Sequence, residues 1–126
     1  MKSILIIDDD EDMGDVLLTF LKGEGHQCRL ASSGKQGLLM AQEQVPRLIL
    51  LDWQMPEMSG REVLLELASL PKLKDVPVIL MSANVANIPE ESLKFRKYLK
   101  KPFDIATLIA LVEKEVSEWI HANDQC

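Results

Sequence analysis

The stretch Leu48 to Gly60, which reads LILLDWQMPEMSG, decides how this sequence folds. Its first four residues form an unbroken apolar run, which predicts a strand that is buried on both faces of a sheet. The run stops at a single carboxylate, Asp52, and Pro56 and Gly60 then mark a loop. In open α/β sheets, ligands bind just beyond the carboxyl ends of the strands. Asp52 is therefore the first candidate functional residue.

Strand and helix patterns alternate five times along the chain. The predicted strands lie at Ser3–Ile7, Gln27–Ala31, Leu48–Leu51, Val76–Met81 and Lys97–Lys100. Such alternation predicts a parallel sheet with helices on both faces and right-handed crossovers. The first, third and fourth strands have the strongest apolar runs and belong at the centre, which leaves the other two at the edges. We expect an α/β, flavodoxin-like three-layer (βα)5 sandwich whose parallel five-stranded sheet has the order 2-1-3-4-5.

Helices are predicted between these strands from capping residues and apolar periodicity. Ser33, Ser59 and Asp104 each stand where a helix should begin, and Ser59 with Glu62 has the form of a capping box. A short helix is predicted over Pro89–Phe95, because proline suits the first turn of a helix. In the first two helices, residues three and four apart predict faces that pack on the sheet: Met13, Val16, Leu17, Phe20 and Leu21, then Leu38, Ala41 and Val45.

The composition indicates one acidic domain. The chain has 126 residues, a formal net charge of −6 and 47% hydrophobic residues, which is enough for one core. We expect a domain over residues 1–122 and a tail over residues 123–126. The negative charge argues against direct binding of nucleic acid, because little would neutralise phosphates. No apolar run approaches the roughly 20 residues of a membrane span, so we expect a cytoplasmic protein without membrane contact.

Three isolated residues receive structural interpretations. Cys28 and Cys126 have neither the spacing of metal ligands nor that of a disulfide framework, so we expect a buried thiol and a free tail thiol. His26 follows Gly25 and is interpreted as a turn residue.

Polar residues collect where the strands end. Asp8 and Asp9 follow the first strand, Asp52 the third and Ser82 the fourth, and Lys101 follows the fifth. Because the carboxyl ends of parallel strands meet at one edge, these side chains should lie close together. Carboxylates about 4 Å apart repel by about 1 kcal/mol per pair in water and about 4 kcal/mol at an effective dielectric of 20. The cluster therefore requires a positive partner.

The residue types of this cluster indicate phosphoryl chemistry. Oxygen ligands without a nearby histidine or thiolate suit a hard divalent cation such as Mg²⁺. Lys101 and Ser82 could hold phosphate oxygens as a charge and a hydrogen-bond donor. The implied reaction is phosphoryl transfer to Asp52 as nucleophile, and a carboxylate needs no general base. Taken singly, Ser82 and Lys101 fit a helix cap and surface charge, so only the set at one edge favours the functional interpretation.

Four segments carry a resemblance to a known family: IIDDDED over residues 6–12, LILLDWQMPEMSG over 48–60, VILMSAN over 78–84 and YLKKPF over 98–103. They resemble the signatures of receiver domains of bacterial two-component response regulators, in particular the single-domain chemotaxis-type regulators. The likeness spans almost the whole chain. It implies that a histidine kinase or a histidine phosphotransfer protein phosphorylates Asp52 in the presence of Mg²⁺, and that a downstream protein target recognises the result.

The resemblance implies a role for each acidic residue of the cluster. Asp52 matches the phosphoacceptor and a metal ligand of the family. Asp9 matches the acid that binds Mg²⁺ directly, and Asp8 matches the acid that acts largely through water. The backbone carbonyl of Gln54 matches the remaining metal ligand from the protein.

The resemblance also implies how the phosphorylated state is read. Ser82 matches the hydroxyl that moves to the phosphoryl group, and Lys101 matches the phosphate-binding lysine. Tyr98 matches the aromatic residue whose ring turns inward on activation. Gln54 and Asn84 occupy positions that tune the lifetime of the aspartyl phosphate, and the bond between Lys101 and the following proline matches one that is cis in the family.

The chain departs from the family between Ser82 and Tyr98, where it is roughly one helical turn shorter than common members. Lys94 and Phe95 replace the small residues that usually precede the fifth strand. We therefore expect the fourth predicted helix to be short, displaced or mobile. The family's usual signalling surface includes this helix, so the resemblance supports the phosphorylation site more strongly than it supports that surface.

Two alternatives remain open at this point. One is a phosphate-independent interaction module with a receiver fold. The other is a Mg²⁺-dependent phosphohydrolase that forms an aspartyl phosphate, although the chain has no insertion long enough for a lid. Our expectation is a signalling domain that is not an enzyme, with slow self-dephosphorylation, and that is a monomer or a weak phosphorylation-dependent dimer.

Overall fold

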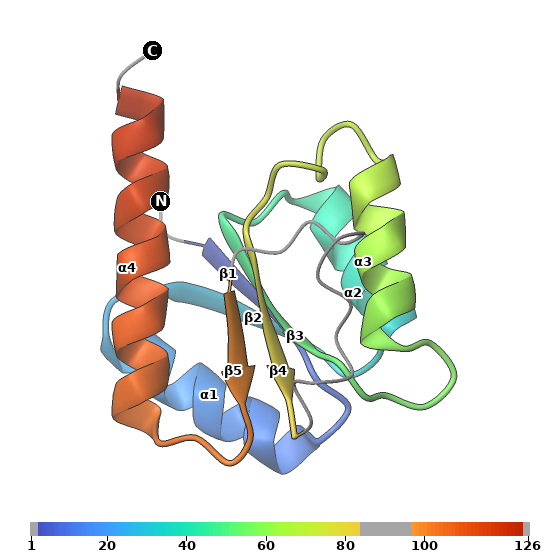
Figure 1. Ribbon diagram of the computed structural model, residues 1–126, viewed down its shortest axis with the longest axis horizontal. Coiled ribbons are helices and arrows are strands. Elements are labelled where there is room, and N and C mark those ends of the chain that lie inside the picture. The colour runs from blue at the N-terminus through green and yellow to red at the C-terminus, as the bar shows by residue number, and fades with distance from the viewer. Residues whose placement is uncertain (1–2, 84–96, 125–126) are drawn as a thin grey trace.

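Five parallel strands form a sheet in the computed structural model, which describes residues 3–83 and 97–124, with side chains as far as Ser117 in the last helix. The order is β2-β1-β3-β4-β5, which confirms the predicted topology (Figure 1). The strand bounds are β1 Ser3–Ile7, β2 Gln27–Ala31, β3 Leu48–Asp52, β4 Val78–Ser82 and β5 Lys97–Lys100.

Helices cover both faces of the sheet, as Figure 1 shows. Their bounds are α1 Glu11–Gly23, α2 Gly34–Glu43, α3 Gly60–Ser69 and α4 Ile105–Asp124. α2 and α3 pack together on one face, and α1 and α4 lie on the other. The predicted helix over Pro89–Phe95 lies outside the described residues.

The core consists of two apolar layers because successive strand residues point to opposite faces. On β1, Leu5 and Ile7 face α2 and α3, whereas Ile4 and Ile6 face α1 and α4. The same alternation holds on β3, and all of these side chains are fully buried. Burying one such side chain contributes about 1.5–3 kcal/mol, so the central strands hold the sheet's carboxyl ends in fixed positions.

The predicted caps are present. The Ser33 hydroxyl accepts a hydrogen bond from the Gln36 N–H at 3.1 Å, and Asp104 accepts one from the Thr107 N–H at 2.7 Å. Ser59 and Glu62 form the reciprocal capping box at the start of α3. Each cap satisfies main-chain donors that the first helical turn leaves free.

The predicted apolar faces of α1 and α2 are wrong in part. Val16 and Phe20 are 43% and 48% exposed, whereas Leu17 and Leu21 are fully buried. α1 lies close to β2 at Gly14, where an added Cβ would lie 2.7 Å from the Leu30 side chain. This contact turns the face of Gly14 and Leu17 toward the sheet and leaves Val16 and Phe20 outside.

Val45 is also outside the core. α2 ends at Glu43, before the helical face predicted from Leu38, Ala41 and Val45 reaches its last member. Val45 is 42% exposed, while Ala41 is fully buried.

His26, which the sequence predicts as a turn residue, lies just after the turn. The turn occupies residues 24 and 25, and the His26 side chain is buried between the end of α1 and α4. Its Nε2 lies 2.8 Å from Glu113 Oε1, and the two residues are 87 positions apart in sequence.

No helix among the described residues is both long and apolar enough to cross a bilayer.

Candidate functional site

Main-chain hydrogen bonds beyond the strand ends position the cluster. The Asp8 N–H donates to the Ala31 carbonyl at 3.0 Å, and the Lys101 N–H donates to the Ser82 carbonyl at 2.8 Å. Asp52 is itself the last residue of β3, where it pairs with Met81 of β4. These contacts extend the pairing of the sheet to its carboxyl edge, so the candidate residues sit on a rigid part of the fold.

Three carboxylates meet at this edge, as the strand order predicts. Oxygen atoms of Asp8, Asp9 and Asp52 all lie within 4.8 Å of one another. Asp8 is fully buried and Asp52 is 5% exposed, whereas Asp9 faces solvent. Asp8 Oδ1 accepts a hydrogen bond from the Asp10 N–H at 2.9 Å. Asp8 Oδ2 is buried and makes no hydrogen bond with the described residues.

Lys101 brings positive charge to the two buried carboxylates. Its Nζ lies 3.3 Å from Asp52 Oδ1 and 3.9 Å from Asp8 Oδ2. The peptide bond between Lys101 and Pro102 is cis, as predicted. One ammonium faces two buried carboxylates, so the described side chains leave the edge with excess negative charge.

The pKa of Asp52 reflects this environment. Burial is the main cause that raises the pKa of Asp52 from its ordinary value of 3.8 to about 7. The charge of Asp8 and a hydrogen bond with Asp9 raise it too, and Lys101 acts in the opposite direction. A cation at this edge would favour the ionised form and lower the pKa.

The residues at the edge fit a bound Mg²⁺ ion. Asp8 Oδ2, a buried oxygen that makes no hydrogen bond within the described part of the chain, lies beside two further carboxylates. Mg²⁺ takes oxygen ligands, commonly one or two carboxylates together with waters and phosphate oxygens. Asp8, Asp9 and Asp52 would hold the ion, and it would supply charge neutralisation for a phosphoryl group at this edge.

The remaining predicted site residues lie around the cluster. Ser82 is buried at the end of β4, next to the strand position that pairs with Asp52. Gln54 is exposed in the loop that follows Asp52. Tyr98 lies on β5, opposite Leu80, and is 49% exposed. Asn84 lies outside the described residues.

The loop between β3 and α3 contains two features that the sequence interpretation missed. Glu57 has a φ of +65°, and Gly60 lies directly against the main chain of Asp52 and Trp53. The Trp53 side chain is buried in the core layer below α2 and α3. In the sequence, Gly60 follows the capping residue Ser59 and is interpreted only as part of the helix start. The sequence therefore does not signal its close contact with the main chain of Asp52 and Trp53.

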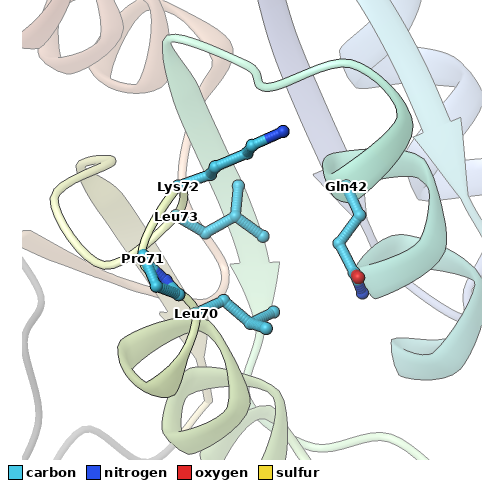
Figure 2. A pocket seen from close by; sticks show the side chains of 5 residues that line it. All are labelled: Gln42, Leu70, Pro71, Lys72 and Leu73. Carbon is cyan, nitrogen blue, oxygen red and sulfur yellow. The ribbon is translucent and has the colours of Figure 1, made fainter.

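Two cavities lie elsewhere. One of about 340 Å³ is lined by Gln42 of α2 and by Leu70 to Leu73 after α3 (Figure 2). A second, of about 200 Å³, is formed by the segments that lead into β3 and β4. Both are therefore near the amino ends of these strands, and neither is lined by a described residue of the acidic cluster.

Comparisons with known proteins agree with this fold. A family model described as "Response regulator receiver domain" matches residues 4–113. The "Uncharacterized 14.6 kDa protein in sodA1 3'region" of Leptolyngbya boryana is 34% identical over 114 residues, which cover 88% of this chain and 87% of that protein. Transcriptional regulatory protein ZraR of Escherichia coli (strain K12) is 38% identical over 117 residues, which cover 90% of this chain and 26% of ZraR.

A solved structure of a response regulator also matches this chain. Response regulator protein TrrA from Thermotoga maritima, determined in complex with Mg(2+)-BeF, matches with a TM-score of 0.79 and 30% sequence identity. The match covers 91% of this chain and 99% of that one.

Proposed function

Since the chain belongs to the response regulator receiver domain family of two-component signalling, we propose that it accepts a phosphoryl group on Asp52. The observation that carries the proposal is the placement of Asp52, which is buried beside Asp8 with Lys101 Nζ at 3.3 Å. A nucleophilic carboxylate, a paired acid and a phosphate-binding lysine stand within reach of one phosphoryl group.

The donor is the phosphohistidine of a histidine kinase or of a histidine phosphotransfer protein. An Asp52 carboxylate oxygen bonds to phosphorus, and the phosphorus–nitrogen bond of the phosphohistidine breaks with its electron pair leaving on the imidazole nitrogen. The product is an aspartyl phosphate. Lys101, which contacts the Asp52 carboxylate before transfer, then neutralises part of the phosphoryl charge.

Mg²⁺ is the proposed cofactor. Asp8, Asp9, Asp52 and the main-chain carbonyl of Gln54 would hold it, and it would neutralise phosphoryl oxygens during transfer. Support comes from Asp8 Oδ2, a buried oxygen without a hydrogen bond to the described residues, and from the TrrA structure, which is a complex with Mg(2+)-BeF. The ionised form of Asp52 is the reactive one, so the excess negative charge of this edge makes transfer dependent on the cation.

The phosphorylated chain acts as a switch for a downstream protein target. A ligand shifts a conformational equilibrium only through its different affinities for the two states. Ser82, buried at the end of β4, would bind the new phosphoryl group, and the half-exposed ring of Tyr98 on β5 would change position in response. The chain is thus proposed as a cytoplasmic signalling domain and not as a turnover enzyme.

Intact mass spectrometry after incubation with a small acyl phosphate tests the proposal. We expect one added phosphoryl group that requires both Mg²⁺ and Asp52, with an Asp52→Asn variant as the control. The absence of any adduct and of donor consumption would contradict the proposal and favour the phosphate-independent module. Rapid repeated turnover of several phosphate esters would instead favour the phosphohydrolase.

A further inference from the structure

We propose that the cavity of about 340 Å³ between α2 and the turn that follows α3 binds a small organic carboxylate with a compact apolar body. This cavity and its smaller neighbour lie near the amino ends of β3 and β4, whereas Asp52 is the last residue of β3. The two sites are therefore at opposite ends of the sheet. Binding at the cavity does not depend on phosphorylation of Asp52.

The wall that the turn contributes is apolar. Leu73 is 2% exposed and belongs to the buried layer below α2 and α3, and Leu70 packs against the same layer. Figure 2 shows both side chains projecting from the turn toward α2. An apolar group in the cavity would extend this layer of the core, and its removal from water would favour binding.

Main-chain hydrogen bonds fix the conformation of the turn. The N–H groups of Leu73 and Lys74 both donate to the Leu70 carbonyl at 2.9 Å. The Val76 N–H then donates to the Leu73 carbonyl at 3.1 Å, just before β4 begins. The apolar wall is thus in place before any ligand arrives.

The opposite wall is the last turn of α2, and a side chain from β2 holds it. The Arg29 guanidinium donates to the Met40 carbonyl at 3.0 Å and to the Gln44 carbonyl at 2.6 Å. Gln42, which lines the cavity, lies between these two residues on the chain. A site with two fixed walls loses little binding free energy to ordering, which is typical of cavities that bind small molecules.

The polar groups of the cavity indicate an anionic ligand. Lys72 lines it, and its ammonium makes no ion pair or hydrogen bond with the described residues. The Gln42 amide nitrogen donates to the Leu38 carbonyl of its own helix at 3.2 Å, so only its oxygen remains for a ligand. An ammonium offers three donors and no acceptor, which suits a carboxylate.

The volume and the neighbouring cavity narrow the class of ligand. Pockets for drug-sized molecules occupy about 300–1,000 Å³, so this cavity suits a molecule at the small end of that range. The second cavity, of about 200 Å³, shares Pro71 and Lys72 with the first but is also lined by Asp75. A carboxylate in the second cavity would face a like charge. The anionic end of the ligand therefore belongs at Lys72 and its apolar body in the first cavity.

A probe with these two parts tests the proposal. Hydrocinnamate carries a phenyl ring and a carboxylate, hydrocinnamamide is its neutral analogue, and phenylpropylamine is a cationic one. Amide chemical shifts of residues 42, 70, 72 and 73 report binding to the native protein. We expect hydrocinnamate to bind about 5-fold more tightly than the neutral amide, as an exposed ion pair allows, and the amine to bind least. Added salt should reduce this preference.

Two pairs of variants locate the site. Lys74 is exposed on the same turn and lines neither of the two cavities, so Lys74→Gln is the matched control for Lys72→Gln. Only Lys72→Gln should weaken hydrocinnamate binding, by about 5-fold. Gln42→Phe should fill the cavity and abolish binding, with a melting temperature at or above the native one. Glu43→Phe, one position along the exposed side of α2, should bind the probe as the native protein does.

Several outcomes would overturn the proposal. No shifts at these residues would mean that the cavity binds no such molecule. Equal affinity for the three probes, or equal losses with Lys72→Gln and Lys74→Gln, would remove the carboxylate from the assignment. Shifts that grow with protein concentration without a probe would identify a second copy of the chain as the occupant. A short blocked peptide with phenylalanine and glutamate that binds more tightly than hydrocinnamate would identify a segment of a partner protein.

Discussion

The buried ionisable groups at the two ends of the sheet differ in how their charges are compensated by neighbouring side chains. At the carboxyl end, Asp8 and Asp52 are buried against Lys101, and Asp8 Oδ2 has no hydrogen bond with the described residues. At the amino end of β2, the buried His26 has Glu113 as its partner at 2.8 Å. The first arrangement has two carboxylates for one ammonium, and the second has one carboxylate for one imidazole.

We interpret this difference as one between groups that serve the proposed function and groups that serve the fold. Two buried carboxylates close together oppose folding, and they persist where a cation or a reaction uses them. His26 and Glu113 instead join the start of β2 to α4, far from the candidate site. Removing a carboxylate at the carboxyl end should therefore abolish phosphorylation and raise stability. Removing the partner of His26 should lower stability and leave phosphorylation intact.

The largest expected effect is that of Asp52→Asn. Phosphoryl incorporation should fall below detection, because the nucleophilic oxygen is lost. The free energy of unfolding should rise by about 1–3 kcal/mol at pH 8 without Mg²⁺, since one of the repelling buried charges is removed. Mass spectrometry and urea unfolding measure the two results. A variant less stable than the native protein would mean that Asp52 is not under electrostatic strain.

The pH dependence of the stability gained by Asp52→Asn tests whether the charge of Asp52 is its cause. The pKa of Asp52 is raised from 3.8 to about 7 by burial and by Asp8, so protonation of Asp52 favours the folded state. This contribution is fully present below pH 3.8 and is lost as the pH rises through 7. The stability difference between Asp52→Asn and the native protein should therefore shrink by about 1–3 kcal/mol between pH 8 and pH 5. Urea unfolding at both values measures it, and a constant difference would contradict this cause.

Glu113 variants test the other end of the sheet. Glu113→Ala leaves the buried His26 Nε2 without its acceptor, so the free energy of unfolding should fall by about 1 kcal/mol. Glu113→Gln keeps an acceptor oxygen and should lose less. Phosphorylation of Asp52 should proceed at the native rate in both variants. A loss of phosphorylation with Glu113→Ala would show that the two ends of the sheet are coupled.

The smallest effect is expected on the outer face of α1. Phe20 is about half exposed, so Phe20→Ser should change the free energy of unfolding by less than about 0.5 kcal/mol. Leu17 is fully buried on the same helix, and Leu17→Ala should cost about 2–5 kcal/mol. Thermal unfolding of the two variants compares them directly, and similar losses would place Phe20 in a packed environment.

The sequence predicted the features that depend on local pattern or on strand order. Ser33, Ser59 and Asp104 cap their helices because capping needs only residues a few positions apart. The approach of Asp8, Asp52 and Lys101 follows from the strand order, since each residue lies at or just after a strand end. The family resemblance supplied the roles of these residues, which remain predictions.

Features that depend on distant contacts were not predictable. His26 became buried because Glu113 and α4 pack over it, and no nearby residue signals a partner 87 positions away. Phe20 repeats with the core positions of α1, but the close contact of Gly14 with Leu30 sets the rotation of that helix. The positive φ of Glu57 had no sequence signal either.

The main-chain bonds that extend the sheet pairing to Asp8 and Lys101 have an evolutionary consequence. A backbone N–H and carbonyl can be supplied by almost any residue, so the identity of the neighbours matters little to the placement of the site. Exposed positions such as Val16, Phe20 and Leu39 do not take part in that placement. Related chains can therefore diverge at their surfaces while the placement of the strand-end residues is inherited.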